Sequence, residues 1–213
     1  TASIAVIGES AFENCLQLTS FTVPATVTSI ATKAFAGCES LTSIQFATEG
    51  ATELEIADFA FMNCTRIATI TLPDHLDEFR STAFEGCDSI KEIKVSATNK
   101  HYINDENGIL YKKEENSTAL TELLFYPKGL AKENNGVINN LPSTLTTIGG
   151  SAFSNNNYLV SVTIPASVTV IDNNAFSCLQ TYSATITDAA SFTTGITVIA
   201  SQSISILILQ GNS

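Results

Sequence analysis

The sequence predicts a repeat solenoid that is mainly β, with about 23 residues in each coil. An Ala-Phe pair recurs, and the steps between successive phenylalanines are 23, 26, 23, 69 and 23 residues, of which 69 is three times 23. Apolar residues alternate with serine and threonine between these pairs. A fixed period in this range is typical of coils that bury their apolar faces only by stacking on their neighbours. The phenylalanines are Phe12, Phe35, Phe61, Phe84, Phe153 and Phe176.

One coil, residues 18–41, contains the expected elements in order. Leu18–Pro24 alternates apolar residues with small polar ones, and this alternation predicts a strand. Pro24 has no backbone N–H to donate, so it fits the end of that strand. Val27–Ile30 predicts a second, shorter strand, and Ala34–Cys38 predicts the turn that leads to the next coil.

The same elements recur along the chain. The three extra residues of the 26-residue step, Thr48–Gly50, are expected in a loop on one face. The last coil, about 183–213, is irregular, with Ile196–Ile199 as its second strand and Ile206–Leu209 as a final strand. The first strand is expected again at Leu41–Phe46, Ile67–Leu72, Ile90–Val95, Leu159–Ile164 and Tyr182–Thr187, and the second at Leu76–Phe79, Leu145–Ile148 and Val168–Ile171.

The middle of the chain departs from the repeat at about residues 96–142, where two Ala-Phe turns are missing. Gly108–Tyr111 and Leu120–Tyr126 are predicted strands joined by a charged turn at Lys112–Ser117. We expect Tyr111 and Phe125 to fill the space that the missing turns leave. The period resumes after this block, so residues 1–213 are predicted to form one solenoid domain.

At this point the residues indicate a family. The pattern Leu-x-x-Ile-x-Ile-Pro-x-x-Val-x-x-Ile-x-x-x-Ala-Phe-x-x-Cys, closely matched by Leu18–Cys38 and Leu159–Phe176, resembles the BspA-like leucine-rich repeats. The resemblance implies a right-handed solenoid with a parallel concave sheet. It also implies surface or secreted proteins of host-associated bacteria and some parasitic protists, a few of which bind host matrix proteins and mediate adhesion.

The five cysteines follow the repeat. Cys15, Cys38, Cys64 and Cys87 each stand three residues after an Ala-Phe phenylalanine, and Cys178 stands one place early. One cysteine per coil does not match the close ligand pairs of structural zinc sites. Cysteines of adjacent coils could reach disulfide distance. We favour free thiols instead, because the slot faces inward and cysteine behaves there as a small apolar residue.

Charge and composition exclude several classes of function. The net charge is −11, with 10 Lys+Arg against 21 Asp+Glu, and this balance argues against nucleic acid or an anionic membrane as a partner. No apolar stretch approaches the roughly 20 residues of a membrane span, so we expect no membrane insertion.

No catalytic, cofactor-binding or metal site is expected, and we predict that the chain is not an enzyme. His75 and His101 are the only histidines, and neither stands in a metal-binding motif. The Asp105–Gly108 turn lacks the ligand spacing of a calcium loop. A catalytic triad whose members meet only in space stays open.

Candidate partner-binding residues lie at the break in the repeat. Aromatic and charged side chains together are typical of interface hot spots. For Tyr102 and Tyr126, a place in the core is an equally good reading. Two outward rows of the first strands are mostly serine and threonine and could form a polar platform: Thr22, Gln45, Thr71, Lys94, Thr163 and Ile186, and Ser20, Ser43, Thr69, Glu92, Ser161 and Ala184. The candidates are Lys91, Glu92, Lys94, Tyr102, Glu122 and Tyr126.

The leading hypothesis is a non-enzymatic extracellular binding module of a cell-surface or secreted protein, attached to a host-matrix or cell-surface protein, with a glycan as the alternative ligand. The chain begins in mid-coil, so we expect a segment of a longer protein. We expect a monomer, with end-to-end association as an option because neither end has a polar cap. The rival hypotheses are a spacer or scaffold, and a hydrolase or an enzyme's glycan-binding appendage. A deep pocket lined by His101 and carboxylates would favour the last.

Overall fold

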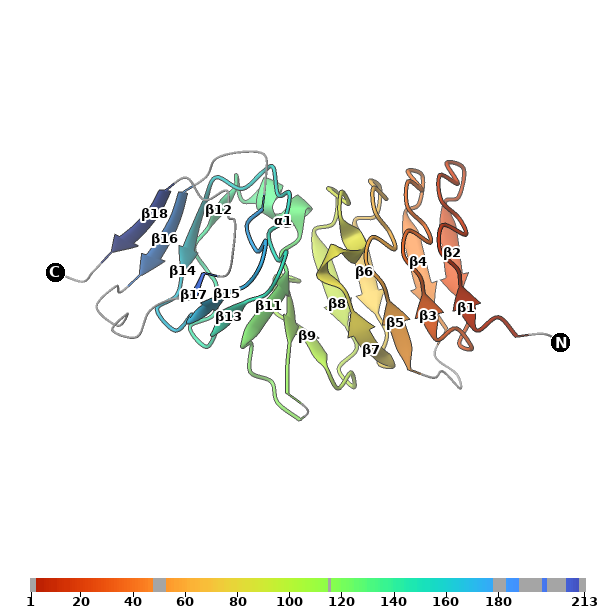
Figure 1. Ribbon diagram of the computed structural model, residues 1–213, viewed down its shortest axis with the longest axis horizontal. Helices are drawn as coiled ribbons and strands as arrows, with labels where there is room; N and C mark the ends of the chain where they lie inside the picture. The colour runs from red at the N-terminus through yellow and green to blue at the C-terminus, as the bar shows by residue number, and fades with distance from the viewer. Residues whose placement is uncertain are drawn as a thin grey trace.

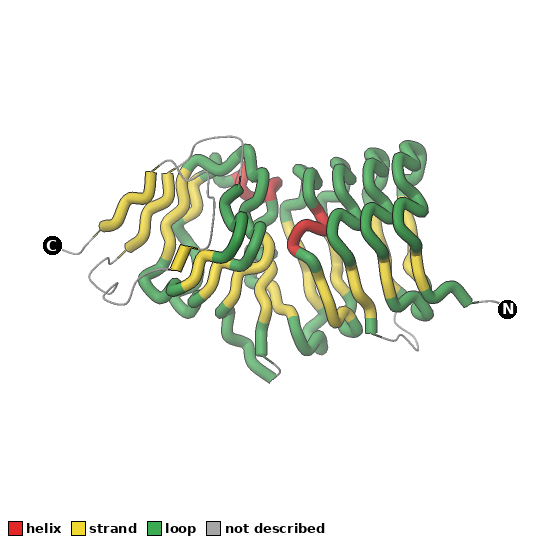
Figure 2. Tube along the Cα trace, in the orientation of Figure 1, coloured by secondary structure: helices red, strands yellow, loops and turns green. Residues whose placement is uncertain are grey.

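The protein is a mainly β solenoid, as predicted, with its two termini at opposite ends of an elongated molecule (Figure 1). The structure, a computed structural model, describes residues 3–47, 53–114 and 116–177, and the backbone of three later strands. Figure 2 shows strands and turns along the molecule, and helix in the described residues is confined to η1 (Ser81–Phe84) and α1 (Lys128–Glu133).

The strands form two ladders, one for each strand of the predicted coil, and paired neighbours run parallel except within the variant block. The first ladder contains β2 (Ser20–Val23), β4 (Ser43–Phe46), β6 (Thr69–Leu72), β8 (Glu92–Val95), β12 (Val137–Ile138), β14 (Ser161–Ile164), β16 (Ser183–Thr187) and β18 (Ile206–Gln210). The second contains β1 (Val6–Ile7), β3 (Ser29–Ile30), β5 (Leu54–Ile56), β7 (Leu76–Phe79), β9 (Tyr102–Asn104), β10 (Leu110–Lys112), β11 (Glu122–Phe125), β13 (Thr147–Ile148), β15 (Val170–Ile171) and β17 (Thr197–Val198).

The Ala-Phe turns stack through a residue whose backbone has the left-handed conformation and which stands two positions after the phenylalanine. Asn14, Gly37, Asn63, Gly86 and Asn155 occupy this slot, and each has a positive φ. Glycine and asparagine tolerate that backbone conformation better than other residues, which explains why these two types stand at the five described positions. The turns at Asn14, Gly37, Asn63 and Asn155 then bond the next coil, as in the 2.7 Å hydrogen bond from the Gly37 N–H to the Met62 carbonyl.

The phenylalanines of these turns form a stacked ladder in the core. Ring centroids of Phe12 and Phe35, Phe35 and Phe61, and Phe61 and Phe84 are 4.9, 5.2 and 5.3 Å apart, and the rings are within 16° of parallel. Each coil offers its ring at the same height, so a side chain that has no partner within its own coil is buried by the coils beside it.

Three of the cysteines are buried free thiols, as predicted. The thiols of Cys38, Cys64 and Cys87 donate to the carbonyl oxygens of the phenylalanines one coil back, at 3.1, 3.2 and 3.0 Å. Burial raises the pKa of Cys38 to about 11. The prediction was wrong for Cys15, which is exposed, because no earlier described coil covers it. Cys178 lies outside the described residues.

The variant block forms a partition between two hydrophobic cores. The two predicted strands are present as β10 and β11, which pair antiparallel. Side chains alternate along a strand, so Leu110 and Phe125 belong to the first core while Tyr111 and Leu123 belong to the second. The aromatic side chains therefore fill the space where two Ala-Phe turns are missing. Neither β9 nor α1 was predicted.

Both ladders are interrupted at this partition. In the first ladder, β8 pairs with β6 and β12 pairs with β14, but β8 and β12 belong to different sheets. Helix α1 lies beside this break (Figure 1), and the Gly129 N–H donates to the Ile90 carbonyl at 2.7 Å. A Cβ at Gly129 would lie 2.6 Å from the Ile90 carbonyl oxygen, so only glycine allows the helix to sit this close.

The pairing of the late strands corrects the register that the sequence predicted for the last coil. β17 pairs with β15 and β18 pairs with β16, where the sequence predicted a second and a final strand. The pairing aligns Ile164 with Ile186, whereas the repeat frame had aligned it with Thr187. A shift of one residue exchanges the two faces of a strand. The sequence rows had placed Ile186 with Thr163 and Ala184 with Ser161, whereas the pairing aligns them with Ile164 and Val162. The predicted insertion at residues 48–50 lies outside the described residues.

Candidate functional site

Tyr102 and Tyr126, two of the predicted partner-binding residues, are part of the core. Their side chains are 6% and 1% exposed. The Tyr102 hydroxyl accepts from the Phe79 N–H at 2.9 Å and donates to the Asp77 carbonyl at 3.0 Å, and burial raises the pKa of Tyr102 to about 12. Tyr126 takes the place of an Ala-Phe phenylalanine and stacks on Phe153 at 5.2 Å. Neither ring can contact a partner while the chain is folded.

The charged candidates are divided between the two ladders. Lys94 and Glu92 lie on β8 and form an exposed ion pair of 3.4 Å. Lys91 precedes them and forms an ion pair with Glu133 at the end of α1. Glu122 lies on β11 in the second ladder. Lys91, Glu92 and Lys94 therefore lie together at and just before β8, and Glu122 lies on a strand of the other ladder.

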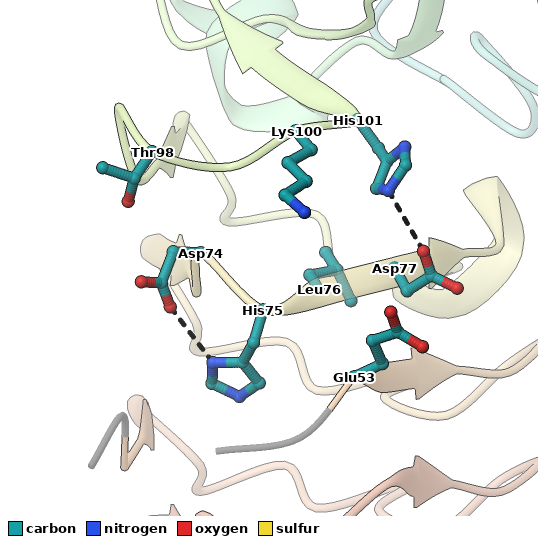
Figure 3. A pocket seen from close by; sticks show the side chains of 8 residues that line it. All are labelled: Glu53, Asp74, His75, Leu76, Asp77, Thr98, Lys100 and His101. Carbon is teal, nitrogen blue, oxygen red and sulfur yellow. Dashed lines mark hydrogen bonds and ion pairs between the residues drawn. The ribbon is translucent and has the colours of Figure 1, made fainter. Parts of the chain in front are cut away.

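A first hollow, which we call the histidine hollow, opens where the second ladder is interrupted (Figure 3). Its volume is about 330 Å³. His75 Nδ1 lies 3.2 Å from Asp74, and His101 Nε2 lies 3.1 Å from Asp77. Figure 3 shows the Lys100 side chain directed into the hollow between the two histidines. It is lined by Glu53, Asp74, His75, Leu76, Asp77, Thr98, Lys100 and His101.

Asn99 builds this hollow, and sequence reasoning missed it. It is 1% exposed and makes five hydrogen bonds. Its amide nitrogen donates to the carbonyls of Pro73, Asp74 and Leu76, and its amide oxygen accepts from the N–H groups of His101 and Tyr102. Asn99 stands in the variant block, and its position is not repeated in the regular coils. No repeated pattern therefore marks it.

The histidine hollow does not assemble a nucleophilic site. Thr98 is the only hydroxyl residue in its lining, and its Oγ1 shares a hydrogen bond of 2.9 Å with Ser96 rather than with a histidine. Nucleophilic catalysis needs a base within hydrogen-bond distance of the attacking atom. Within the described part of the chain, no group of three or more histidine, cysteine or acidic residues could hold a metal ion.

The Asp105 turn also has a structural role. The Asp105 carboxylate accepts hydrogen bonds from the N–H groups of Asn107 and Ile109, at 3.0 and 2.9 Å. These bonds close the turn that leads into β10.

A second hollow, which we call the cationic hollow, opens where the first ladder is interrupted. Its volume is about 630 Å³. Two neighbouring coils form one wall, and α1 forms the other. Lys91 is the one predicted site residue that lines it. It is lined by Arg66, Ala68, Asp88, Ser89, Lys91, Gly129, Lys132 and Glu133.

Comparison with solved structures identifies similar solenoids. A leucine-rich repeat protein from Eubacterium ventriosum ATCC 27560 is 24% identical, with a TM-score of 0.67. The comparison covers 100% of this chain and 59% of that chain. The pneumococcal vaccine antigen PcpA is 19% identical, with a TM-score of 0.58, covering 82% of this chain and 42% of that chain. The chain thus spans about half the length of these proteins. No curated protein matches it.

The described helices include none that is long and apolar enough to cross a membrane. The family model for the BspA type leucine rich repeat region, in six copies, matches residues 5–107 and 134–208. The unmatched residues between these two ranges contain β10, β11 and all of α1, which build the partition. With most of its length matched, the chain belongs to the BspA-type leucine-rich repeat family.

Proposed function

We propose that the protein is a non-enzymatic binding module of a cell-surface or secreted protein and that it attaches to a protein of the host or of a neighbouring cell. One observation carries the proposal. At the partition, Lys91 lines the cationic hollow, and the strand that follows it, β8, presents Glu92 and Lys94 as an exposed ion pair. Repeat arrays commonly bind partners on such outward surfaces.

The chemistry of the surface supports binding rather than catalysis. The histidine hollow offers two histidine–carboxylate pairs but no hydroxyl or thiol bonded to either histidine among its lining residues. Leucine-rich repeats generally mediate protein–protein interaction. We also propose that the protein is extracellular. PcpA is described as a vaccine antigen, which agrees with that location.

A binding screen against extracellular matrix and cell-surface proteins tests the proposal. The purified chain should retain at least one protein partner, and the double variant Lys91→Ala, Lys94→Ala should weaken that binding by about tenfold or more, as for a small hot spot. The matched control is Lys112→Ala, Lys113→Ala, which removes two cations from the end of β10 and the residue that follows it.

If a folded sample binds none of the proteins in the screen, that result would contradict the binding role and favour a spacer. Equal loss in the control pair would show that the contact is only a general charge effect. A glycan bound in place of a protein would support the alternative ligand class.

A further inference from the structure

We propose that the cationic hollow is a binding site for a short acidic peptide segment of a partner protein. This inference rests on the proposed function, since it names the part of the partner that the module would recognise. Nothing in the repeat pattern predicts the site, because its two walls come from segments about 40 residues apart that meet only at the partition, as the Lys91–Glu133 ion pair shows.

The ion pairs around the hollow leave two cations without a partner. Lys91 is paired with Glu133, and Asp88 is paired with Lys128 behind the wall at 3.5 Å. Arg66 forms no ion pair with any residue that the structure describes. Lys132 lies over the Tyr158 ring, 5.2 Å from its centroid, and forms no ion pair with a carboxylate of the described residues.

The walls that carry these two cations are held in place by buried contacts. Lys128 is 4% exposed and lies between Glu85 and Asp88, with its Nζ 3.3 and 3.5 Å from their carboxylates. Breaking a buried ion pair leaves an unpaired charge, so this contact fixes α1 against the preceding coil. Gly129 fixes the same helix through its hydrogen bond to Ile90. Little order has to be gained when a ligand binds to a site built this way.

Arg66 faces the hollow from a regular coil. It stands two residues after Cys64, and Ser89 holds the same position after Cys87 in the next coil. Arg66 therefore lies beside a small side chain, and the equivalent neighbours Ala68 and Lys91 leave room between them. A guanidinium presents parallel donors that match the two oxygens of a carboxylate.

The mixed charge of the lining favours a peptide over a polyanion. Asp88 and Glu133 line the same hollow as the cations, and the whole chain carries a net charge of −11. A sulfated glycan would meet these carboxylates and the negative field of the molecule. A peptide with one or two carboxylates, and neutral residues between them, can satisfy Arg66 and Lys132 while its backbone passes over Ala68 and Gly129.

Isothermal titration calorimetry with an acetylated hexapeptide of alternating glutamate and glycine tests the site. The glutamine–glycine hexapeptide and a fully sulfated hexasaccharide are the comparison ligands. We expect the acidic peptide to bind in preference to both. Arg66→Gln and Lys132→Gln should each weaken binding by about tenfold, the size expected for one charge-assisted hydrogen bond. Lys112→Gln, a cation on β10, should leave the affinity unchanged.

Failure of the acidic peptide to bind, equal binding of the glutamine peptide, or tighter binding of the sulfated saccharide would overturn the proposal. Unchanged affinity for the acidic peptide in both Arg66→Gln and Lys132→Gln would also overturn it. Circular dichroism and thermal unfolding check that each variant is folded. A protein partner from the screen that is insensitive to Arg66→Gln and Lys132→Gln would refute this site and leave the proposed function standing. Binding of the acidic peptide without any protein partner in the screen would support this site and contradict the proposed function.

Discussion

Phe84 is the residue whose removal tests the repeat and the partition together. It has no exposed surface, and it stands at the end of the stacked ladder, where the first core meets the partition. Its ring stacks on Phe61 at 5.3 Å, tilts against Phe79 at 5.7 Å and meets Phe125 edge-on at 6.2 Å. Phe84→Ala therefore removes contacts with the preceding coil, with its own coil and with the partition.

The expected loss of unfolding free energy follows from these contacts. Truncating a buried phenylalanine to alanine typically costs about 3 to 5 kcal/mol, which includes the cavity that remains. Favourable aromatic pairs add about 0.5 to 1.5 kcal/mol each beyond their burial. Three ring partners on different segments limit how far the site can collapse, so we expect the loss to lie near 5 kcal/mol.

Urea denaturation followed by circular dichroism measures this loss. The matched control is Phe12→Ala, which removes the same side chain from the same slot of the first coil. Phe12 is only partly buried and loses its stacking partner Phe35 and its tilted partner Phe21. We expect it to cost about half as much, because part of its surface already faces solvent.

A loss below about 1 kcal/mol for Phe84→Ala, the size of an ordinary point change, would refute the reasoning. Equal losses of unfolding free energy for Phe84→Ala and Phe12→Ala would also contradict it, because the fuller burial of Phe84 would then add no stability.

Two further predictions concern buried polar groups. Asn99→Asp should cost at least about 3 kcal/mol at neutral pH, because a carboxylate cannot donate to three carbonyls; thermal unfolding measures it, and an unchanged midpoint would contradict the role of Asn99. In a Cys178→Ser background, a thiol reagent at pH 8 should modify Cys15 at once and the three buried thiols only on unfolding; fast reaction of several thiols would contradict their burial. Because burial raises the pKa of Cys38 to about 11 from 9.0, the folded state keeps a proton that the unfolded chain loses, and stability should fall as the pH rises through that interval.

The regular coils could be predicted from the sequence because each of their features is repeated. The alternation that marked residues 18–24 as a strand recurs in the other coils, and the structure has β2, β4, β6, β8 and β14 where it predicts them. The cysteine slot was also predicted to be buried. Cys15 departs from that prediction because burial in a stack depends on having a neighbour, which a slot in the sequence does not reveal.

The variant block was only partly predictable. Its two strands have the usual alternation, but β9 and α1 are short and are held by contacts outside their own segments. Tyr102 was ambiguous in the sequence and is resolved by the partner of its hydroxyl, the backbone of β7 one coil earlier. Aromatic residues beside charges looked like an interface, whereas the missing Ala-Phe turns had created a core position for them.

The sequence by itself determined the period, the two ladders, the stacked turns and the family, because these depend on local patterns that are repeated many times. Only the tertiary structure decided where the repeat is interrupted in space and what surrounds the interruption. The Ser81 hydroxyl donates to the Gly150 carbonyl, 69 residues away, and Lys128 reaches back to Glu85, 43 residues away. Such contacts occur once each, between segments with no common pattern. The partition and the hollows beside it therefore follow from packing rather than from periodicity.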